Sequence, residues 1–182
     1  MEAVKLYIFD VDGTLRFTTV PGQKYPLNCH QWRLMPHVAE MLRYTRWDTG
    51  RRWLAVCSNQ LGVGDRYLSR RVARELIQDT VAAAVGYLPA HTIIAMCTCP
   101  EGASCPRMKP NPGMLQELLR HYEVTAAEAL YVGDQLLDAE AARRAGVPFT
   151  YADEFFGWHR PESLAQERRS RAPTDALRSD IS

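Results

Sequence analysis

Two aspartates that follow a short apolar segment near the start of the chain are the residues best placed to do chemistry. The apolar segment is Leu6 to Phe9, and Asp10 and Asp12 come directly after it, followed by Gly13. An apolar run of this length is typical of a strand buried on both faces, and a glycine marks where the chain must turn. Ionised carboxylates beside a core are costly unless a cation or hydrogen bonds compensate them. The pair predicts a divalent-metal site or, as a purely structural alternative, a turn capped by aspartate.

The rest of the chain alternates strand-like apolar segments with segments of helical periodicity. Further strands are predicted at residues 53–57, 92–96, 130–132 and 147–151, and helices at residues 36–50, 112–122 and 136–145. One more helix should begin after Asp65 or Ser69 and run to about Val85. Residues 16–33 show no periodicity and are predicted to be a loop, too short for a cap domain. The expected fold class is α/β: a doubly wound, Rossmann-like three-layer sandwich with a central parallel sheet of about five strands and no cap domain.

Polar or small residues follow the expected strands where a parallel sheet binds its ligands. Such sheets bind ligands at the carboxyl ends of their strands. Ser58 and Asn59 follow the second expected strand, and Gly133 and Asp134 follow the fourth. We therefore expect these residues to lie beside Asp10 at one edge of the sheet.

These residue types can together transfer a phosphoryl group. A carboxylate such as that of Asp10 can attack phosphorus and form an aspartyl-phosphate. Asp12 lies within reach of the leaving-group oxygen, which it could protonate before deprotonating water. Lys109 could neutralise the charge that develops in the transition state. With Asp134 and Asp138, the acids would repel one another without a hard cation, and Mg²⁺ suits oxygen ligands and phosphate substrates.

The order and types of these residues resemble the haloacid dehalogenase superfamily of phosphatases over about residues 4–151. The motifs that carry the resemblance are Asp10-Val-Asp12-Gly-Thr14, Ser58-Asn59-Gln60, Lys109-Pro and Gly133-Asp134-x-x-x-Asp138. The resemblance implies three catalytic residues, namely the nucleophile Asp10, the acid and base Asp12 and the cation Lys109. The resemblance implies Ser58 as a phosphate ligand. Asn59, among the residues whose backbone N–H groups follow Ser58, and Lys109 are further candidates to bind the substrate phosphate. The implied Mg²⁺ ligands are Asp10, the backbone carbonyl of Asp12 and Asp134, with Asp138 orienting them from one step out.

One branch that the sequence resembles contains the histidinol-phosphate and D-glycero-D-manno-heptose 1,7-bisphosphate phosphatases. The resemblance lies in the segments Lys109-Pro-Asn-Pro-Gly-Met114 and Gly133-Asp134-Gln-Leu-Leu-Asp138 and in a cysteine-rich loop, which binds zinc in this branch. The first motif departs from the branch, because Val11 stands where arginine is typical. This branch implies a small phosphorylated metabolite as substrate, such as a sugar (heptose) bisphosphate or histidinol phosphate.

The cysteine-rich loop departs from the pattern of that branch. The candidate zinc ligands are Cys97, Cys99 and Cys105. Three thiolates leave one position of a tetrahedral structural site open, so a zinc site and a zinc-free loop with reduced cysteines both remain alternatives. Arg107 stands where the fourth ligand is usual, and His91 is the histidine to test in that role. Met108 stands where this branch has an arginine that contacts the substrate. We therefore hypothesise that Arg107, one residue earlier, binds the substrate phosphate instead.

A second resemblance is to the polynucleotide 3′-phosphatases. It rests on Asp10-Val-Asp-Gly-Thr-Leu15, Trp32-Arg33-Leu-Met-Pro36, Asn59-Gln60-Leu-Gly-Val-Gly64 and Pro148-Phe-Thr-Tyr-Ala-Asp-Glu-Phe-Phe156. In that case an arginine stripe could contact backbone phosphates, namely Arg66, Arg70 and Arg74, although a solvated helix face is the simpler interpretation. The cysteine loop and the spacing to Asp138 favour the small-molecule branch, so nucleic acid is the alternative partner. A non-catalytic binding module is a third hypothesis, which the complete set of motif acids and Lys109 disfavours.

Composition and charge set the remaining expectations. The chain has 182 residues, 46% of them apolar, and a net charge of +1, which gives no global field for nonspecific nucleic-acid binding. One phosphatase domain is expected over residues 1–159, followed by a polar tail over residues 160–182. No apolar run could cross a bilayer and no secretory signal is evident, so we expect a cytoplasmic protein without membrane contacts. The sequence indicates nothing about oligomeric state.

Overall fold

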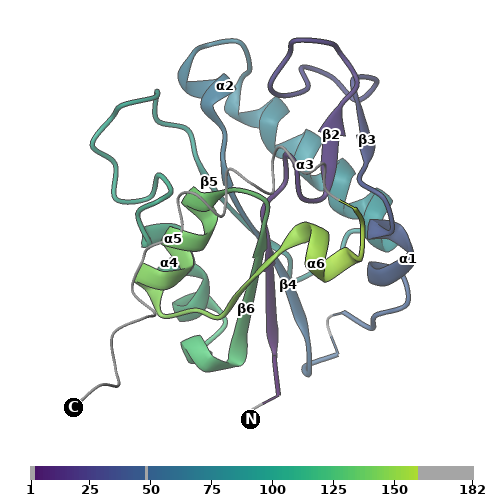
Figure 1. Cartoon of the computed structure of the whole chain (residues 1–182), viewed down its shortest axis with the longest axis vertical. Helices are drawn as coiled ribbons and strands as arrows, with labels where there is room; N and C mark the ends of the chain where they lie inside the picture. The colour runs from purple at the N-terminus through teal and green to yellow at the C-terminus, as the bar shows by residue number, and fades with distance from the viewer. Residues whose placement is uncertain (1–2, 48, 160–182) are drawn as a thin grey trace, which may run out of the picture.

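A five-stranded parallel sheet forms the centre of the molecule (Figure 1). The computed structural model describes residues 3–47 and 49–159. The strands are β1 (Leu6–Phe9), β4 (Trp53–Asn59), β5 (Ile93–Cys97), β6 (Ala129–Gly133) and β7 (Phe149–Tyr151), in the order β5-β4-β1-β6-β7. The chain adds β4 and β5 on one side of β1 and then crosses to place β6 and β7 on the other side. The predicted doubly wound topology is confirmed, and its reversal point lies at β1.

Helices cover both faces of the sheet and complete the predicted three-layer sandwich (Figure 1). One face carries α1 (Val38–Leu42), α3 (Arg70–Val85) and α6 (Ala152–Phe156), and the other carries α4 (Gly113–His121) and α5 (Leu136–Ala145). The short helix α2 (Leu61–Gly64) follows β4, and the 3₁₀ helix η1 (Ala126–Glu128) precedes β6. Within the described residues no cap domain is evident, as expected.

The alternation of side chains along the strands supplies the two apolar cores. Phe9 of β1 packs in the core beneath α1, α3 and α6, whereas Leu6 and Ile8 pack in the core beneath α4 and α5. All three side chains are fully buried. Because successive residues of a strand face opposite sides of its sheet, an unbroken apolar segment is what a strand in the middle layer requires.

Three local predictions about helices and their caps hold in the structure. Ser69 is the cap of α3, because its hydroxyl accepts a hydrogen bond from the backbone N–H of Val72 at 3.2 Å. The helix predicted at residues 136–145 is α5, with the same bounds. Thr125 and Glu128 form the expected capping box, which closes the 3₁₀ turn η1.

Two other predictions were wrong. The helix expected at residues 36–50 is only α1, because the chain turns after Leu42 to bury Trp47 in the core. The Trp47 indole N–H donates to the carbonyl oxygen of Leu42 at 3.0 Å and so satisfies one of the carbonyls at the helix end. The loop expected at residues 16–33 contains an antiparallel hairpin, formed by β2 (Arg16–Thr18) and β3 (Trp32–Leu34).

No helix in the described ranges is long and apolar enough to cross a membrane. The expected polar tail of residues 160–182 lies outside the described residues, so the domain boundary at residue 159 stays a prediction.

A buried arginine joins the hairpin to α3. Arg16 is 1% exposed, and its Nη1 donates to the carbonyl oxygen of Leu76 at 2.9 Å and to the hydroxyl of Thr80 at 3.0 Å. Its Nε donates to a carboxylate oxygen of Asp12 at 2.8 Å. The guanidinium carbon also lies 6.0 Å from the ring centre of Trp32. Each guanidinium nitrogen of Arg16 therefore has a hydrogen-bond partner, as a buried charge requires.

Replacing Arg16 should destabilise the protein much more than replacing an exposed arginine. In Arg16→Met the Asp12 carboxylate loses its cation, and we expect the free energy of unfolding to fall by about 2–3 kcal/mol. Arg71→Met is the matched control, because its ion pair with Glu75 lies on the solvent side of α3 and should change stability by less than about 0.5 kcal/mol. Urea denaturation followed by circular dichroism measures both changes. Equal stability of the two variants would contradict this role of Arg16.

Candidate active site

The predicted residues meet in a cleft at the carboxyl ends of β1, β4 and β6. The cleft has a volume of about 400 Å³, and its lining includes Asp10, Asp12, Ser58, Asn59, Lys109 and Asp138. Asp10 directly follows β1, and Ser58 and Asn59 end β4. Asp138 lies in the first turn of α5, which follows β6. The order of the strands thus brings together residues that are far apart in the sequence.

The Lys109 ammonium group lies at the centre of the cluster. Its Nζ lies 2.7 Å from Oδ1 of Asp10 and 2.6 Å from Oδ1 of Asp138. It also donates to the carbonyl oxygen of Cys57 at 3.2 Å and approaches the hydroxyl of Tyr131 at 3.0 Å. Lys109 is 4% exposed, so these contacts replace its hydration shell. One cation therefore fixes the positions of two acids on different elements.

Three carboxyl groups and one ammonium group share this cluster. Oxygen atoms of Asp10, Asp134 and Asp138 all lie within 4.8 Å of one another, and Lys109 is the cation bound among them. Burial raises the pKa of Asp10 to about 8, although Lys109 opposes the shift. Burial alone would lower the pKa of Lys109, but the charges of Asp10 and Asp138 outweigh it and raise that pKa above its usual value. A second cation near the three carboxylates would offset their repulsion.

The asparagine of the second motif holds the backbone of Lys109. The Asn59 side-chain oxygen accepts from the Lys109 N–H at 3.0 Å, and its amide nitrogen donates to the Lys109 carbonyl oxygen at 3.1 Å. The Asn59 side chain therefore positions the backbone of Lys109. The predicted contacts of Ser58 and Asn59 with a substrate phosphate stay predictions, and both residues line the cleft.

Asp12 belongs to a second hydrogen-bond network on the other side of the cleft. Its Oδ1 accepts from Arg16, and its Oδ2 accepts from the Gln60 amide at 3.2 Å. The same Gln60 nitrogen lies 2.9 Å from Oγ of Ser58. The Asp12 side chain is 25% exposed, so it stays open to the cleft on one side. This geometry holds the Asp12 carboxylate in place while leaving it accessible from the cleft.

The turn at Gly13, in the first motif, lies directly against the carboxylate of Asp134, in the fourth motif. Gly13 has φ +92°, and a Cβ atom built at this position would overlap the Asp134 carboxylate. The Thr14 hydroxyl donates to Oδ1 of Asp134 at 3.4 Å. Both the backbone conformation and the close approach therefore require glycine here.

Asp138 uses both carboxylate oxygens for protein contacts. Its Oδ1 accepts from Lys109 and from the Tyr131 hydroxyl at 2.8 Å, and its Oδ2 accepts from the backbone N–H of Gln135 at 3.0 Å. These contacts fit a residue that orients the metal site from one step out better than a direct ligand.

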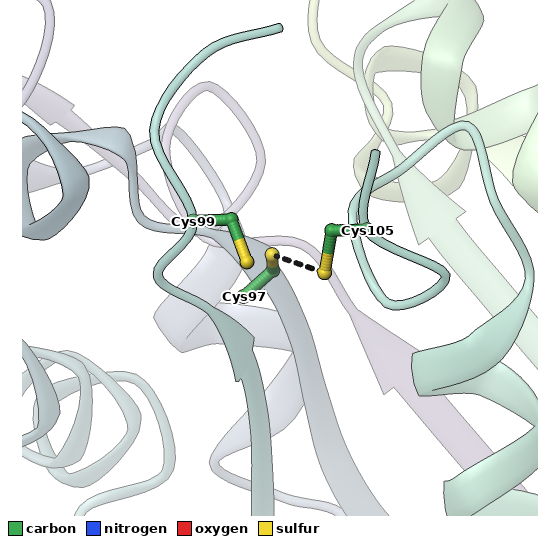
Figure 2. A group of neighbouring side chains, drawn as sticks. All are labelled: Cys97, Cys99 and Cys105. Atoms are coloured by element: carbon green, nitrogen blue, oxygen red, sulfur yellow. Dashed lines mark hydrogen bonds between the residues drawn. The ribbon is translucent and has the colours of Figure 1, made fainter. Parts of the chain in front are cut away.

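The three cysteines of the predicted zinc loop come together beside the cleft (Figure 2). Cys97 ends β5, and Cys99 and Cys105 lie in the loop that leads to Lys109, with the three sulfur atoms pointing toward one another. Sulfur atoms that bind one tetrahedral zinc at 2.3 Å lie about 3.8 Å apart. The Cys97 and Cys105 sulfur atoms are 3.6 Å apart, so the group fits a zinc ion. His91 is separated from it by the length of β5, because it precedes that strand and Cys97 ends it.

Arg107, which was predicted to bind the substrate phosphate, does not line the cleft. Its Nε lies 2.9 Å from Oε1 of Glu117 on α4, and it is not among the described residues that line the cleft. The substrate contact hypothesised for Arg107 therefore has no support in this geometry.

Sequence reasoning missed several residues of the site. Arg16 and Tyr131 contact catalytic candidates, while Lys24, Tyr25 and Glu101 line the cleft. One signal in the sequence could have indicated Arg16. It lies four residues after Asp12, at the start of the short strand β2. Lys24 and Tyr25 carried none, because the hairpin that places them was not predicted.

The family model and the sequence relatives that match this chain are all described as phosphatases. A family model described as polynucleotide kinase 3 phosphatase matches residues 5–159. The D-glycero-beta-D-manno-heptose-1,7-bisphosphate 7-phosphatase of Bordetella bronchiseptica is 31% identical over 147 residues, which is 79% of this chain and 77% of the relative. The enzyme of the same name from Pseudomonas aeruginosa is 29% identical over 143 residues, which is 76% of this chain and 75% of the relative.

Solved structures show the same architecture. The D,D-heptose 1,7-bisphosphate phosphatase of B. bronchiseptica, solved with magnesium and phosphate, superposes with a TM-score of 0.67 at 24% identity, over 80% of this chain and 79% of that one. A HAD-like phosphatase from Mesorhizobium loti gives a TM-score of 0.64 at 22% identity, over 80% and 70% of the two chains. At these identities the likeness establishes the fold, and the sequence matches establish the family. The chain therefore belongs to the polynucleotide kinase 3 phosphatase family, within the haloacid dehalogenase superfamily of phosphatases.

Proposed function

We propose that this phosphatase hydrolyses a phosphomonoester of a sugar bisphosphate, with Mg²⁺ and through an aspartyl-phosphate on Asp10. The observation that carries the proposal is the Lys109 ammonium group held between Asp10 and Asp138 at the carboxyl end of the central strand. This contact keeps a buried carboxylate next to a cation and open to the cleft, which is what a nucleophile toward an anionic phosphate needs.

Two displacement steps follow from the positions of the acids. In the first, an Asp10 oxygen forms a bond to phosphorus as the bond to the leaving-group oxygen breaks, and Asp12 gives that oxygen a proton. In the second, Asp12 takes a proton from water while the water oxygen bonds to phosphorus, which releases phosphate and restores the Asp10 carboxylate. Ser58 would bind a phosphoryl oxygen, and Lys109 would stabilise the charge of both transition states.

The donors present fit Mg²⁺. The side chains of Asp10 and Asp134 and the backbone carbonyl of Asp12 would hold it, with Asp138 fixing the arrangement through Lys109 and Tyr131. All of these donors are oxygen atoms, which this hard cation prefers. When bound, Mg²⁺ would neutralise phosphate charge and relieve repulsion among the carboxylates. The related B. bronchiseptica structure was solved with magnesium and phosphate, which supports the same cofactor here.

The sugar bisphosphate is proposed from the relatives and from the open cleft. The sequence relatives reported above act on a heptose 1,7-bisphosphate, as their names state. In the described part of the chain no cap domain covers the cleft, so its size does not limit the substrate to the smallest phosphate esters. Histidinol phosphate remains a further small-molecule candidate.

A polynucleotide 3′-phosphate is the second candidate substrate. It is favoured by the family model, whose description names this activity and whose match spans residues 5–159. An uncapped cleft also admits the end of a polymer. The arginines first considered for backbone contacts do not share one helix, because Arg66 precedes α3 whereas Arg70 and Arg74 lie on it.

A zinc ion bound by Cys97, Cys99 and Cys105 is proposed as a structural cofactor. The Cys105 carbonyl oxygen accepts from the Met108 N–H at 3.1 Å and from the Asn111 side chain at 2.9 Å. A metal at Cys105 would therefore restrain the loop on both sides of Lys109. The proposed ligands are three thiolates, with the fourth position left to water or another ligand.

A substrate comparison tests the proposed function. Wild-type protein with Mg²⁺ should hydrolyse heptose 1,7-bisphosphate with a kcat/KM at least about tenfold above that for histidinol phosphate or a 3′-phosphorylated oligonucleotide. EDTA should abolish the activity and Mg²⁺ restore it, while Asp10→Asn should lower kcat by roughly a thousandfold or more. A tenfold preference for the oligonucleotide would instead assign the second candidate function. A wild-type protein that hydrolyses none of the three would contradict the proposed function.

Metal analysis tests the zinc proposal. Protein purified from zinc-supplemented medium should contain about one zinc per chain, and Cys105→Ser should lose most of it because two thiolates bind zinc weakly. Cys29→Ser is the matched control, since Cys29 is exposed and lies outside the cysteine group. Wild-type protein without zinc, or equal zinc contents in the two variants, would exclude the site.

A further inference from the structure

The loop between β2 and β3 places Lys24 and Tyr25 in the lining of the catalytic cleft, although neither has a part in the steps above. The loop is held by its own side chains. The Gln23 amide donates to the Tyr25 carbonyl oxygen at 2.5 Å and to Oε1 of Gln31 at 3.1 Å. The same Gln31 oxygen accepts from the Leu27 N–H at 2.8 Å. Lys24 therefore lies between Gln23 and Tyr25, which these hydrogen bonds hold in place.

Tyr25 fastens this loop to α2. A Cβ atom added to Gly62 would lie 2.5 Å from the Tyr25 ring, so the ring packs against the helix at a position open only to glycine. The ring centre of Tyr67 lies 6.4 Å from that of Tyr25. This packing fixes the backbone of Lys24 at the mouth of the cleft.

Lys24 differs in charge from most of the titratable residues around it. Among the described residues that line the cleft, the cations are Lys24 and Lys109, and the acids are Asp10, Asp12, Glu101 and Asp138. Lys109 is buried and bound to two of the acids, whereas Lys24 is exposed and has no ion pair within the described part of the chain. An anionic group of the substrate away from the reacting phosphate would be repelled by Glu101 and attracted by Lys24.

A second hollow shares two lining residues with the cleft. It has a volume of about 300 Å³ and is lined by Gly22, Gln23, Lys24, Tyr25, Leu27 and Tyr67. Lys24 and Tyr25 line both spaces. Lys24 therefore borders both the catalytic cleft and the space beside it.

We propose that Lys24 binds a second phosphate group of the substrate and so makes the site selective for substrates that carry two phosphates. This inference rests on the proposed function, because it assigns the reacting phosphate to Asp10 and Lys109. The second phosphate is either the distal group of a sugar bisphosphate or the phosphodiester next to a 3′-phosphate, since the chemistry that Lys24 recognises is the same in both.

Binding to the Asp10→Asn variant tests the inference without requiring turnover. Isothermal titration calorimetry would compare fructose 1,6-bisphosphate with fructose 6-phosphate, and the dinucleotide TpTp with thymidine 3′-monophosphate. We expect the two-phosphate member of at least one pair to bind roughly tenfold more tightly, as a charge-assisted contact of an exposed lysine would give. Adding Lys24→Gln should remove that advantage and leave the affinity of the one-phosphate member unchanged.

Arg120→Gln is the matched control, because this exposed arginine lies near the end of α4, outside the cleft lining. It should leave every affinity unchanged. The pair that responds to Lys24→Gln identifies the source of the second phosphate. The inference is overturned if neither pair shows the advantage, if Lys24→Gln leaves it intact, or if that change weakens both members of a pair equally. This experiment measures binding and not turnover. A protein that binds these ligands but hydrolyses none of them would contradict the proposed function, and the effect of Lys24→Gln on affinity could still be measured.

Discussion

The burial of one ammonium group between two carboxylates is the constraint on which the rest of the site depends. Lys109 has so little exposed surface that its charge must be balanced by protein groups, and Asp10 and Asp138 supply that balance from two different elements. Removing Lys109 would leave two buried carboxylates without the cation that lies between them, which costs several kcal/mol. The Asn59 side chain and the cysteine loop are arranged around this contact, since both hold the backbone near Lys109.

The topology of the sheet explains how such distant residues meet. β1 lies between β4 and β6, so the carboxyl ends of these strands deliver the first, second and fourth motifs to one edge. The third motif arrives from the loop after β5, which is long enough to carry Lys109 back over the end of β4. A parallel doubly wound sheet binds ligands at its reversal point for this reason, and the cleft lies there.

The sequence allowed the sheet, most helices and the central cluster to be predicted, because each depends on local patterns. The apolar run before Asp10, the serine before α3 and the periodicity of α5 are signals within a few residues. The hairpin, the buried Arg16 and the early end of α1 depend on contacts between distant segments, such as Arg16 with Thr80. Asn59 and Arg107 have the residue types of phosphate ligands, yet their partners, Lys109 and Glu117, could be identified only from the packed structure.

Trapping the covalent intermediate tests the central proposal, that Asp10 is the nucleophile, most directly. Wild-type protein would be mixed with Mg²⁺ and heptose 1,7-bisphosphate, quenched during turnover and reduced with borohydride, which converts an acyl phosphate to an alcohol. We expect peptide mass spectrometry to find homoserine in place of aspartate at residue 10, only when substrate is present. Reduction at another carboxylate, or rapid release of phosphate with Asp10 never modified, would contradict the proposed role of Asp10.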